Sequence, residues 1–439
     1  MTDIARRLVV AAGLLFCGWS GAGAEAPPAL TPAQDHAVID EVARLVSAHY
    51  VFPDMRAGIV AELRRREAAG RYTIANPAEF ARVLSDDMVA ISQDRHMWFA
   101  YDPAAYRAAL LPRDANDSDP LSDAAALRDN QGYEEMRILP GNVRYVRLSG
   151  FEWSGDVTTR VVADVARFLH GADAIILDIA GNGGGSGDAV KALVSYFLPP
   201  DGRVLMNFHD TFEGKDFSTR VIDKLDAPRL TGIPLYVLIS SHTGSAAEEF
   251  TAHIRYFKLG TLVGSNTAGA ANNDHGFPIA PFFVQSISVG RTEHPVMHGN
   301  WERIGLAPDV AAAPGQALAQ AEVLALTGLL ARPSDTAHRE DYAWALVAAD
   351  AALHPPRLDA AALAAYAGKY GARKIWLADG VLQYQREGRE ATTLTPLADD
   401  LFALDNNPEV RVRFRRAGGK IAGFDSITAD GQAIPAARD

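Results

Sequence analysis

The stretch Leu238–Phe250, LISSHTGSAAEEF, joins an apolar run to a helix-like segment through a turn of small residues. This order indicates a strand-to-helix elbow in a layered α/β core. Ser245 stands at the elbow, where its hydroxyl can face a cleft and nearby backbone N–H groups can face an anion. The same letters also fit a helix cap, in which Ser245 or Thr243 begins the helix and Glu248 completes a capping box.

Composition limits the classes of protein that this chain can be. It has 439 residues, of which 48% are hydrophobic, and a formal net charge of -12 at pH 7. These values predict a globular protein with a large core and about two or three domains. Nucleic acid and anionic lipid are excluded as main partners, because they require a concentrated basic face that the sequence lacks.

The first residues, 1–24, have the pattern of a secretion signal. Two arginines precede an apolar run shorter than the roughly 20 residues that span a bilayer, and a small-x-small site, AGA, precedes Glu25. We therefore predict export to the periplasm or the medium, without an integral membrane segment after cleavage; an uncleaved anchor is the alternative. The only cysteine, Cys17, lies in this segment. A mature chain without cysteine excludes disulfides, thiol catalysis and Cys-ligated zinc.

The pattern of apolar residues changes along the chain and predicts separate domains. Helical spacing dominates the N-terminal part, where Thr31-Pro32 and Asn76-Pro77 are expected helix starts. Short β-branched runs then alternate with helical patterns, and strand periods with DG, EG and GG turns follow. The predicted parts are a signal peptide (1–24), a helical domain (25–102), a polar connector (103–130), an α/β core (131–332), a helix and linker (333–356) and a small antiparallel β module (357–439).

A glycine run, Gly183–Gly185, follows the strand-like segment AIILDIA. Such a loop lets backbone amides approach a phosphate or a developing oxyanion closely. The nucleotide-binding patterns do not fit: no Lys-Ser/Thr follows at P-loop spacing, and Ser186 or Asp188 occupies the last glycine position of G-x-G-x-x-G. We therefore favour an oxyanion loop, with a tight structural turn as the alternative.

Two more segments carry residues of possible chemical use. His96 leaves a helical pattern and enters the apolar run HMWFAYD, and Glu302 lies in a turn of HGNWERIGLAPDV. Taken alone, each also fits a plain role, His96 as a structural side chain and Glu302 as a solvated acid.

The order and combination of these segments resemble the tail-specific, or C-terminal processing, family of serine peptidases. The resemblance is closest to the branch of the tricorn core protease and the interphotoreceptor retinoid-binding protein, and no PDZ-like insertion follows His96. It covers roughly residues 30–330 and implies a crotonase-like (ClpP-like) spiral of βαβ units as the core. The matching segments, in family order, are HYVFPD, DRHMWFAYDP, NQGYEEMRILPGNVRYVRLSGF, LDIAGNGGG, TGSAAEEF, VGSNTAGA and WERIGLAPDV.

The resemblance implies a catalytic set. The family's nucleophile falls on Ser245, three residues before Glu248 in the S-A-x-E motif, and its base falls on His96. Glu302, in the pattern E-x-x-G-x-x-P-D, matches the acidic partner of the tricorn type. The related processing peptidases use a lysine about 25 residues after the serine. Here the only lysine between Ser245 and Glu302 is Lys258, which leaves a Ser/His mechanism.

The resemblance also implies oxyanion donors, the backbone N–H groups of Ala246 and of Gly183 or Gly184. Two positions depart from the family pattern. Arg95 replaces the serine that precedes the histidine, and Ala180 replaces the arginine of the D-x-R-x-N loop.

The resulting expectation is an exported serine peptidase that cleaves peptides or proteins through an acyl-enzyme, without a metal or other cofactor. Two alternatives share the scaffold. One is a carrier of a lipophilic ligand, with HMWFAYD and FPIAPFFVQSISV lining an apolar cleft. The other is a crotonase-type acyl-CoA enzyme. The sequence leaves the cleavage preference and the oligomeric state open.

Overall fold

The computed structural model describes residues 29–110, 120–332 and 337–439. The predicted signal peptide with Cys17 and part of each predicted connector lie outside these residues. The chain divides into two compact units. One unit contains the chain up to Met136 with Val146–Gly171 and Leu177–Ala311, and the other contains Arg137–Tyr145, Ala172–Ile176 and Ala312–Asp439. The domain boundaries given above stay predictions.

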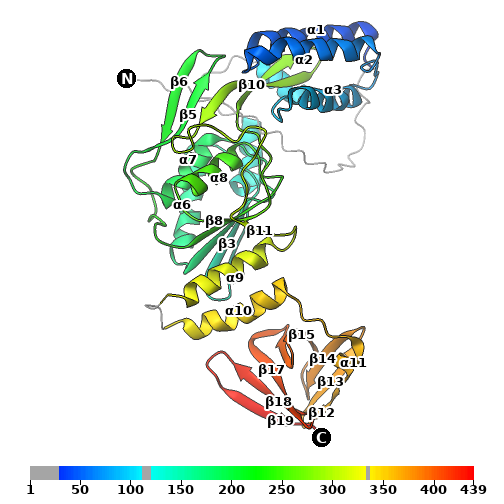
Figure 1. Ribbon diagram of the computed structural model, residues 1–439, viewed down its shortest axis with the longest axis vertical. Coiled ribbons are helices and arrows are strands. Elements are labelled where there is room, and N and C mark those ends of the chain that lie inside the picture. The colour runs from blue at the N-terminus through cyan, green and yellow to red at the C-terminus, as the bar shows by residue number, and fades with distance from the viewer. Residues whose placement is uncertain (1–28, 111–119, 333–336) are drawn as a thin grey trace. The chain divides into compact units, whose positions relative to one another are not determined.

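Three helices form the N-terminal part of the first unit (Figure 1): α1 (Pro32–His49), α2 (Pro53–Ala68) and α3 (Pro77–Ser92). Thr31 and Gln34 form a capping box at α1, and the Asn76 carboxamide oxygen accepts the first free N–H groups of α3. A proline follows each of these caps, which suits the first helical position. Both predicted helix starts are confirmed.

A five-stranded antiparallel sheet follows these helices. Its order is β1-β10-β5-β6, with β9 also paired to β10. Phe99 and Phe283 stack across it with ring centroids 5.0 Å apart, in one core with the buried faces of the helices. The runs HMWFAYD and FPIAPFFVQSISV therefore close a core rather than line an open cleft. The strands are β1 (Phe99–Tyr101), β5 (Val204–Asp210), β6 (Lys215–Arg220), β9 (Asn273–Ile279) and β10 (Phe283–Glu293).

A six-stranded sheet of order β11-β8-β7-β4-β3-β2 forms the α/β core. β7 and β8 pair in parallel, and their apolar runs are almost wholly buried, as expected when helices cover a parallel sheet. α6 contacts α7, and α7 contacts α8 (Figure 1). The elements are β2 (Tyr133–Leu139), β3 (Val143–Leu148), β4 (Ala174–Asp178), β7 (Leu235–Ile239), β8 (Thr261–Gly264), β11 (Val310–Ala311), α6 (Asp156–His170), α7 (Gly187–Val194) and α8 (Ala246–Tyr256).

The second unit contains two helices, α9 (Ala317–Leu330) and α10 (Arg339–Leu353), a short α11 (Ala360–Ala364) and an eight-stranded antiparallel sheet. Its strands pair in chain order around a core that includes Tyr370, Phe402 and Phe424. They are β12 (Gly368–Tyr370), β13 (Arg373–Ala378), β14 (Val381–Arg386), β15 (Thr392–Ala398), β16 (Leu401–Leu404), β17 (Asn407–Ala417), β18 (Lys420–Thr428) and β19 (Ala433–Ala437).

The predicted fold class is confirmed as an α/β core with a helical N-terminal region and a C-terminal antiparallel sheet. The described part of the predicted polar connector is more ordered than its composition indicates. It contains α4 (Pro103–Leu110), α5 (Pro120–Arg128) and a 3₁₀ turn, Asn130–Gly132. Outside the connector, a second 3₁₀ turn, Ser195–Phe197, follows α7. Over the described ranges, no helix combines the length and apolar character needed to cross a membrane.

Candidate active site

Ser245 joins β7 to α8 in a backbone conformation that few residues adopt. Its φ is 50° and its ψ is -122°, so it lies outside the regions that side chains with a Cβ usually occupy. The residue immediately precedes α8, which begins at Ala246. Ser245 is therefore the N-cap residue of α8, as the alternative interpretation of the sequence predicted, and it also ends the loop that follows β7.

The glycine loop after β4 packs directly against this elbow. A Cβ at Gly184 would lie 2.7 Å from the Ser245 Cβ and 3.1 Å from the Ala246 nitrogen, and the φ of Gly184 is +122°. At Gly185, with φ +133°, a Cβ would lie 2.3 Å from the Phe151 carbonyl oxygen. Only glycine allows two backbone segments to approach this closely.

Hydrogen bonds fasten the same two loops together. The Gly244 N–H donates to the Asn182 carbonyl (3.1 Å), and the Thr243 hydroxyl donates to the Ile179 carbonyl (2.9 Å). Thr243 is fully buried, so its role is to join the loops after β4 and β7. The elbow and the glycine loop therefore form one rigid corner.

Glu248 fixes the elbow from the helix side. Its carboxylate accepts the Ser245 N–H (3.2 Å), the Thr267 hydroxyl (2.5 Å) and the N–H groups of Gly269 and Ala270 (2.7 Å each). The side chain is wholly buried. Burial raises its pKa, and the hydrogen bonds oppose this rise. Glu248 thus ties the elbow to the loop after β8, and its place near the N-terminus of α8 suits a negative charge.

His96 reaches Ser245 from a distant part of the sequence. α3 ends at Ser92, and its C-cap residue, Gln93, has the left-handed conformation. The Asp94 Oδ1 then accepts the His96 N–H at 2.9 Å. The His96 Nε2 lies 3.1 Å from the Ser245 Oγ, although the two residues are 149 positions apart. The structure therefore brings together the predicted nucleophile and base.

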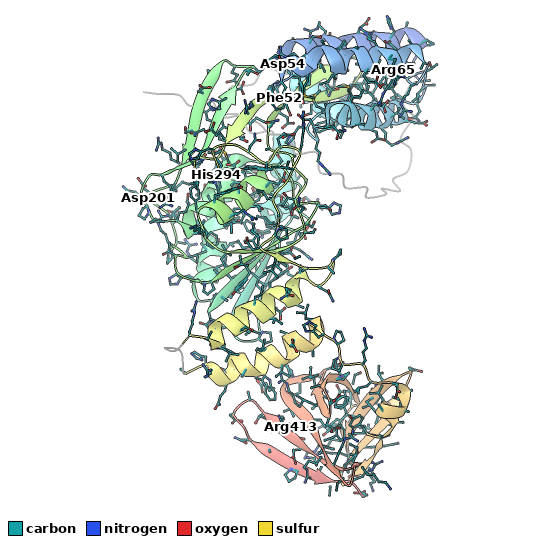
Figure 2. All side chains as sticks on the ribbon, in the orientation of Figure 1. Phe52, Asp54, Arg65, Asp201, His294 and Arg413 are labelled. Carbon is teal, nitrogen blue, oxygen red and sulfur yellow. The ribbon has the colours of Figure 1, made fainter. Side chains whose placement is uncertain are left out.

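Charge distinguishes His96 from the other buried histidines. Burial lowers the pKa of His96, but the charges of nearby acids, first Asp274 and then Asp94, outweigh it and raise the pKa above its ordinary value. Burial lowers the pKa of His253 and His294 to about 3. These two rings pack together 5.3 Å apart, and Figure 2 labels His294, the residue that follows β10. Of these three histidines, only His96 has a pKa that its surroundings raise.

Glu302 lies close to the pair but makes no direct hydrogen bond to His96. Its Oε2 accepts the N–H groups of Ala271 (2.8 Å) and Asn272 (3.1 Å), while its Oε1 has no partner within the described residues. Burial and the charge of Asp94 raise the pKa of Glu302 to about 7. Glu302 therefore acts on His96 through space or through another group.

Only some of the predicted oxyanion amides are free to donate a hydrogen bond to a ligand. The Gly184 N–H already donates to the Asn182 side chain at 2.9 Å. The N–H groups of Gly183 and Ala246 have no acceptor among residues 29–110, 120–332 and 337–439. Ala246 is the first residue of α8, so no helical carbonyl is available to it. An anion beside Ser245 would therefore meet Gly183 and Ala246.

A cavity of about 520 Å³ opens at Ser245. Stacked rings of Phe208 and Phe217, with centroids 4.7 Å apart, form part of its wall, and the buried Trp301 forms another part. The Glu249 carboxyl also lines it, and burial raises the pKa of Glu249 to about 8. The mixture of aromatic walls and a few polar groups suits the side chain of an organic ligand.

Neither Lys258 nor Lys191 is placed to act as a base on Ser245. Lys258 follows the C-terminal end of α8, whereas Ser245 precedes the N-terminal end, and the 11 residues of α8 span about 16 Å. Lys191 lines the cavity, but its ammonium is paired with Asp188 at 2.5 Å.

Three side chains near Ser245 offer donor atoms that could hold a metal ion. Over the described ranges, Asp94, His96 and Glu302 form the group of three or more acidic, histidine or cysteine side chains whose ligand atoms converge. Sequence reasoning missed Asp94, as well as the use of Asn182 to hold the glycine loop. The D-x-H spacing was a signal for Asp94, since an aspartate readily accepts the N–H two residues later.

A serine hydroxyl beside an imidazole and two free amides is the arrangement by which hydrolases activate a serine nucleophile. Residues 142–312 match the model of peptidase family S41, and this segment of the chain belongs to that family. The predicted family is thus confirmed, while the tricorn-like branch stays a prediction.

Several solved structures are similar to this chain. One is a lipoprotein from Streptococcus agalactiae, with 13% identity over 68% of this chain and 98% of that chain and a TM-score of 0.44. The photosystem II D1 C-terminal processing protease has 16% identity over 65% and 94%, with a TM-score of 0.39. The tricorn protease has 10% identity over 68% and 36%, with a TM-score of 0.44.

The close packing at the glycine loop leads to a first prediction. Gly184→Ala should destabilise the protein by on the order of 1–3 kcal/mol, because the new Cβ meets the elbow and the φ is unfavourable. Gly181→Ala is the matched control, since a Cβ there meets no atom within 4 Å. Urea unfolding followed by circular dichroism measures both. Equal stability of the two variants would contradict the packing argument.

Proposed function

We propose that the protein is a serine peptidase that cleaves peptide bonds through an acyl-enzyme on Ser245, with His96 as the general base. The observation that carries this proposal is the 3.1 Å contact between the His96 Nε2 and the Ser245 Oγ. It falls within the range for proton transfer between a nucleophile and its base. The S41 family match of residues 142–312 supports peptide bonds as the target.

In the proposed reaction, the Ser245 Oγ attacks the peptide carbonyl while its proton moves to the His96 Nε2. The carbonyl oxygen becomes an anion, which accepts hydrogen bonds from the N–H groups of Gly183 and Ala246. The protonated His96 then gives its proton to the departing amine, which leaves an ester on Ser245. Water repeats the two steps and releases the acid.

The oxyanion amides account for a large part of the proposed rate enhancement. Loss of one such donor typically costs about 10²–10³ in turnover. The Asn182 side chain supports this arrangement, because its oxygen holds the Gly184 N–H and its amide donates to the Leu148 carbonyl at 3.0 Å. The loop therefore keeps its shape without the family arginine that Ala180 replaces.

The cavity supports a peptide as the substrate. It extends from Ser245 between aromatic walls, where the substrate side chain next to the scissile bond would fit. The carrier alternative lacks such support, since its two expected lining segments pack against each other in the core.

A fluorophosphonate probe tests the nucleophile. The intact protein should be labelled on Ser245, and both Ser245→Ala and His96→Ala should lose labelling and peptidase activity by at least about 10³-fold. Mass spectrometry of the tryptic peptide identifies the labelled residue, and circular dichroism controls for folding. Absence of labelling together with saturable binding of retinoid or fatty acid would favour the carrier instead.

The pH dependence tests the base. His96 must be neutral to accept a proton, and its pKa is raised, so kcat/KM should fall as the pH drops and reach half its maximum above pH 6.5. The profile of kcat/KM between pH 5 and 9 on a fluorogenic peptide measures this. A midpoint below the ordinary histidine value would contradict the proposed charge environment.

We also propose export, on the basis of the signal-like residues 1–24. Expression of the full chain in a Gram-negative host should yield a periplasmic protein that begins at Glu25, as measured by mass spectrometry of the intact protein. A cytoplasmic, uncleaved product would contradict export.

A further inference from the structure

Three polar atoms beside the Ser245–His96 pair have no hydrogen-bond partner within the described residues. They are the His96 Nδ1, the Asp94 Oδ2 and the Glu302 Oε1. The Asp94 side chain is 0% exposed and that of His96 is 8% exposed, so bulk water does not satisfy these two. A buried polar atom without a partner costs about 1–3 kcal/mol. A single group that satisfies all three would therefore stabilise the site.

The three residues that carry these atoms converge. One ring nitrogen of His96 and one carboxylate oxygen from each of Asp94 and Glu302 all lie within 4.8 Å of one another. The other atoms of these side chains are already used, because Nε2 contacts Ser245 and the remaining carboxylate oxygens accept backbone N–H groups. We therefore infer that the atoms within 4.8 Å of one another are the three without a partner, the His96 Nδ1, the Asp94 Oδ2 and the Glu302 Oε1.

The spacing matches a water molecule. Three atoms no more than 4.8 Å apart share a point that lies within about 2.8 Å of each, which is an ordinary hydrogen-bond length. A zinc ion would need its ligands at about 2.0–2.2 Å. Water requires two to four polar partners at a buried position, and this position offers three.

Proton positions also favour water over a metal. The His96 Nε2 must be unprotonated to accept the Ser245 proton, so the ring hydrogen is on Nδ1 and this nitrogen is a donor. A water molecule can accept from Nδ1 and donate its two hydrogens to the Asp94 and Glu302 carboxylates. Each of the three atoms then has one partner, and no atom of the water is used twice.

We propose that Asp94 and Glu302 together orient His96 through one shared water molecule, which makes Asp94 a positioning residue for proton transfer. The inference rests on the proposed function, because the orientation has a catalytic meaning only if His96 is the base. Asp94 then has two tasks. Its Oδ1 fixes the loop through the His96 N–H, and its Oδ2 fixes the ring through the water.

Other charges surround the imidazole and stay in place when Asp94 is changed. Asp274 from β9, Glu248 from α8 and Glu302 after β10 face it with negative charge. Arg303, the residue after Glu302, donates from its guanidinium to the Tyr50 hydroxyl and the Ser92 carbonyl. Removal of the Asp94 charge should therefore shift the equilibrium of His96 toward its neutral form.

Asp94→Asn separates the two tasks of Asp94. Asparagine keeps a carbonyl oxygen for the His96 N–H, so the loop stays folded, but its amide is a donor where the water needs an acceptor. We expect kcat to fall about 10- to 100-fold and KM to stay nearly unchanged. This loss is a part of the rate enhancement that general base catalysis typically supplies. The acid limb of kcat/KM should move to lower pH, because one negative charge near His96 is lost.

Two further variants make the test specific. Asp35→Asn is the matched control, because Asp35 in α1 is also buried, at 7% exposure, and also has an unpartnered oxygen, but lies outside the site. It should leave kcat and the pH profile unchanged. Glu302→Gln should lower kcat, and the double variant Asp94→Asn/Glu302→Gln should lose less than the product of the two single losses, since both acids act through one water.

A readout without turnover separates this inference from the proposed function. In the Ser245→Ala protein with ¹⁵N-labelled histidine, NMR titration should give a lower pKa for His96 when Asp94→Asn is added. Unchanged kcat, pH profile and His96 titration in a folded Asp94→Asn protein would overturn the inference. Stoichiometric zinc binding in calorimetry that Asp94→Asn abolishes would also overturn it, in favour of a metal site. Failure of Ser245→Ala to lose activity would overturn the proposed function instead.

Discussion

The conformation of Ser245 is the constraint on which the rest of the site depends. A positive φ at a residue with a Cβ costs on the order of 1–3 kcal/mol, and it persists only where the surroundings fix it. Here Glu248 holds the Ser245 N–H from within α8, and Gly184 lies so close that no side chain can come between the loops. Ser245 is at the same time the N-cap residue of α8, and the Glu248 side chain accepts its N–H as in a capping box.

The helical N-terminal region has a specific role in this arrangement, which is to deliver the imidazole. α3 ends at a left-handed residue, and the next turn carries His96 toward the elbow before β1 joins the five-stranded sheet. Arg303, next to Glu302, donates to the Ser92 carbonyl at the end of α3. This hydrogen bond connects the segment that contains Glu302 to the end of the helix that precedes His96.

The fold could be predicted from the sequence because its signals are local. Thr31 and Asn76 mark helix starts by their own chemistry, and the apolar run before Ser245 reads as a buried strand. The site could be predicted only in part. The order of the family's motifs points to Ser245 and His96. The hydrogen bond from the Gly184 N–H to the Asn182 side chain could not be predicted, because it depends on how that side chain folds back on its own loop. The cavity walls depend on β5 and β6, whose Phe208 and Phe217 meet only when the strands pair.

The acids around His96 also resolve an apparent conflict in its environment. Burial alone would make the imidazole a weak base, because a charged ring loses its hydration there. In the proposed reaction, proton transfer from Ser245 would create that charged ring, and the carboxylates around it would stabilise the product of the transfer more than the starting state. The same charges raise the pKa of His96, which protonates a larger fraction of the resting protein at a given pH. Burial and the acids therefore act on the pKa of His96 in opposite directions, and the effect of the acids is the larger one.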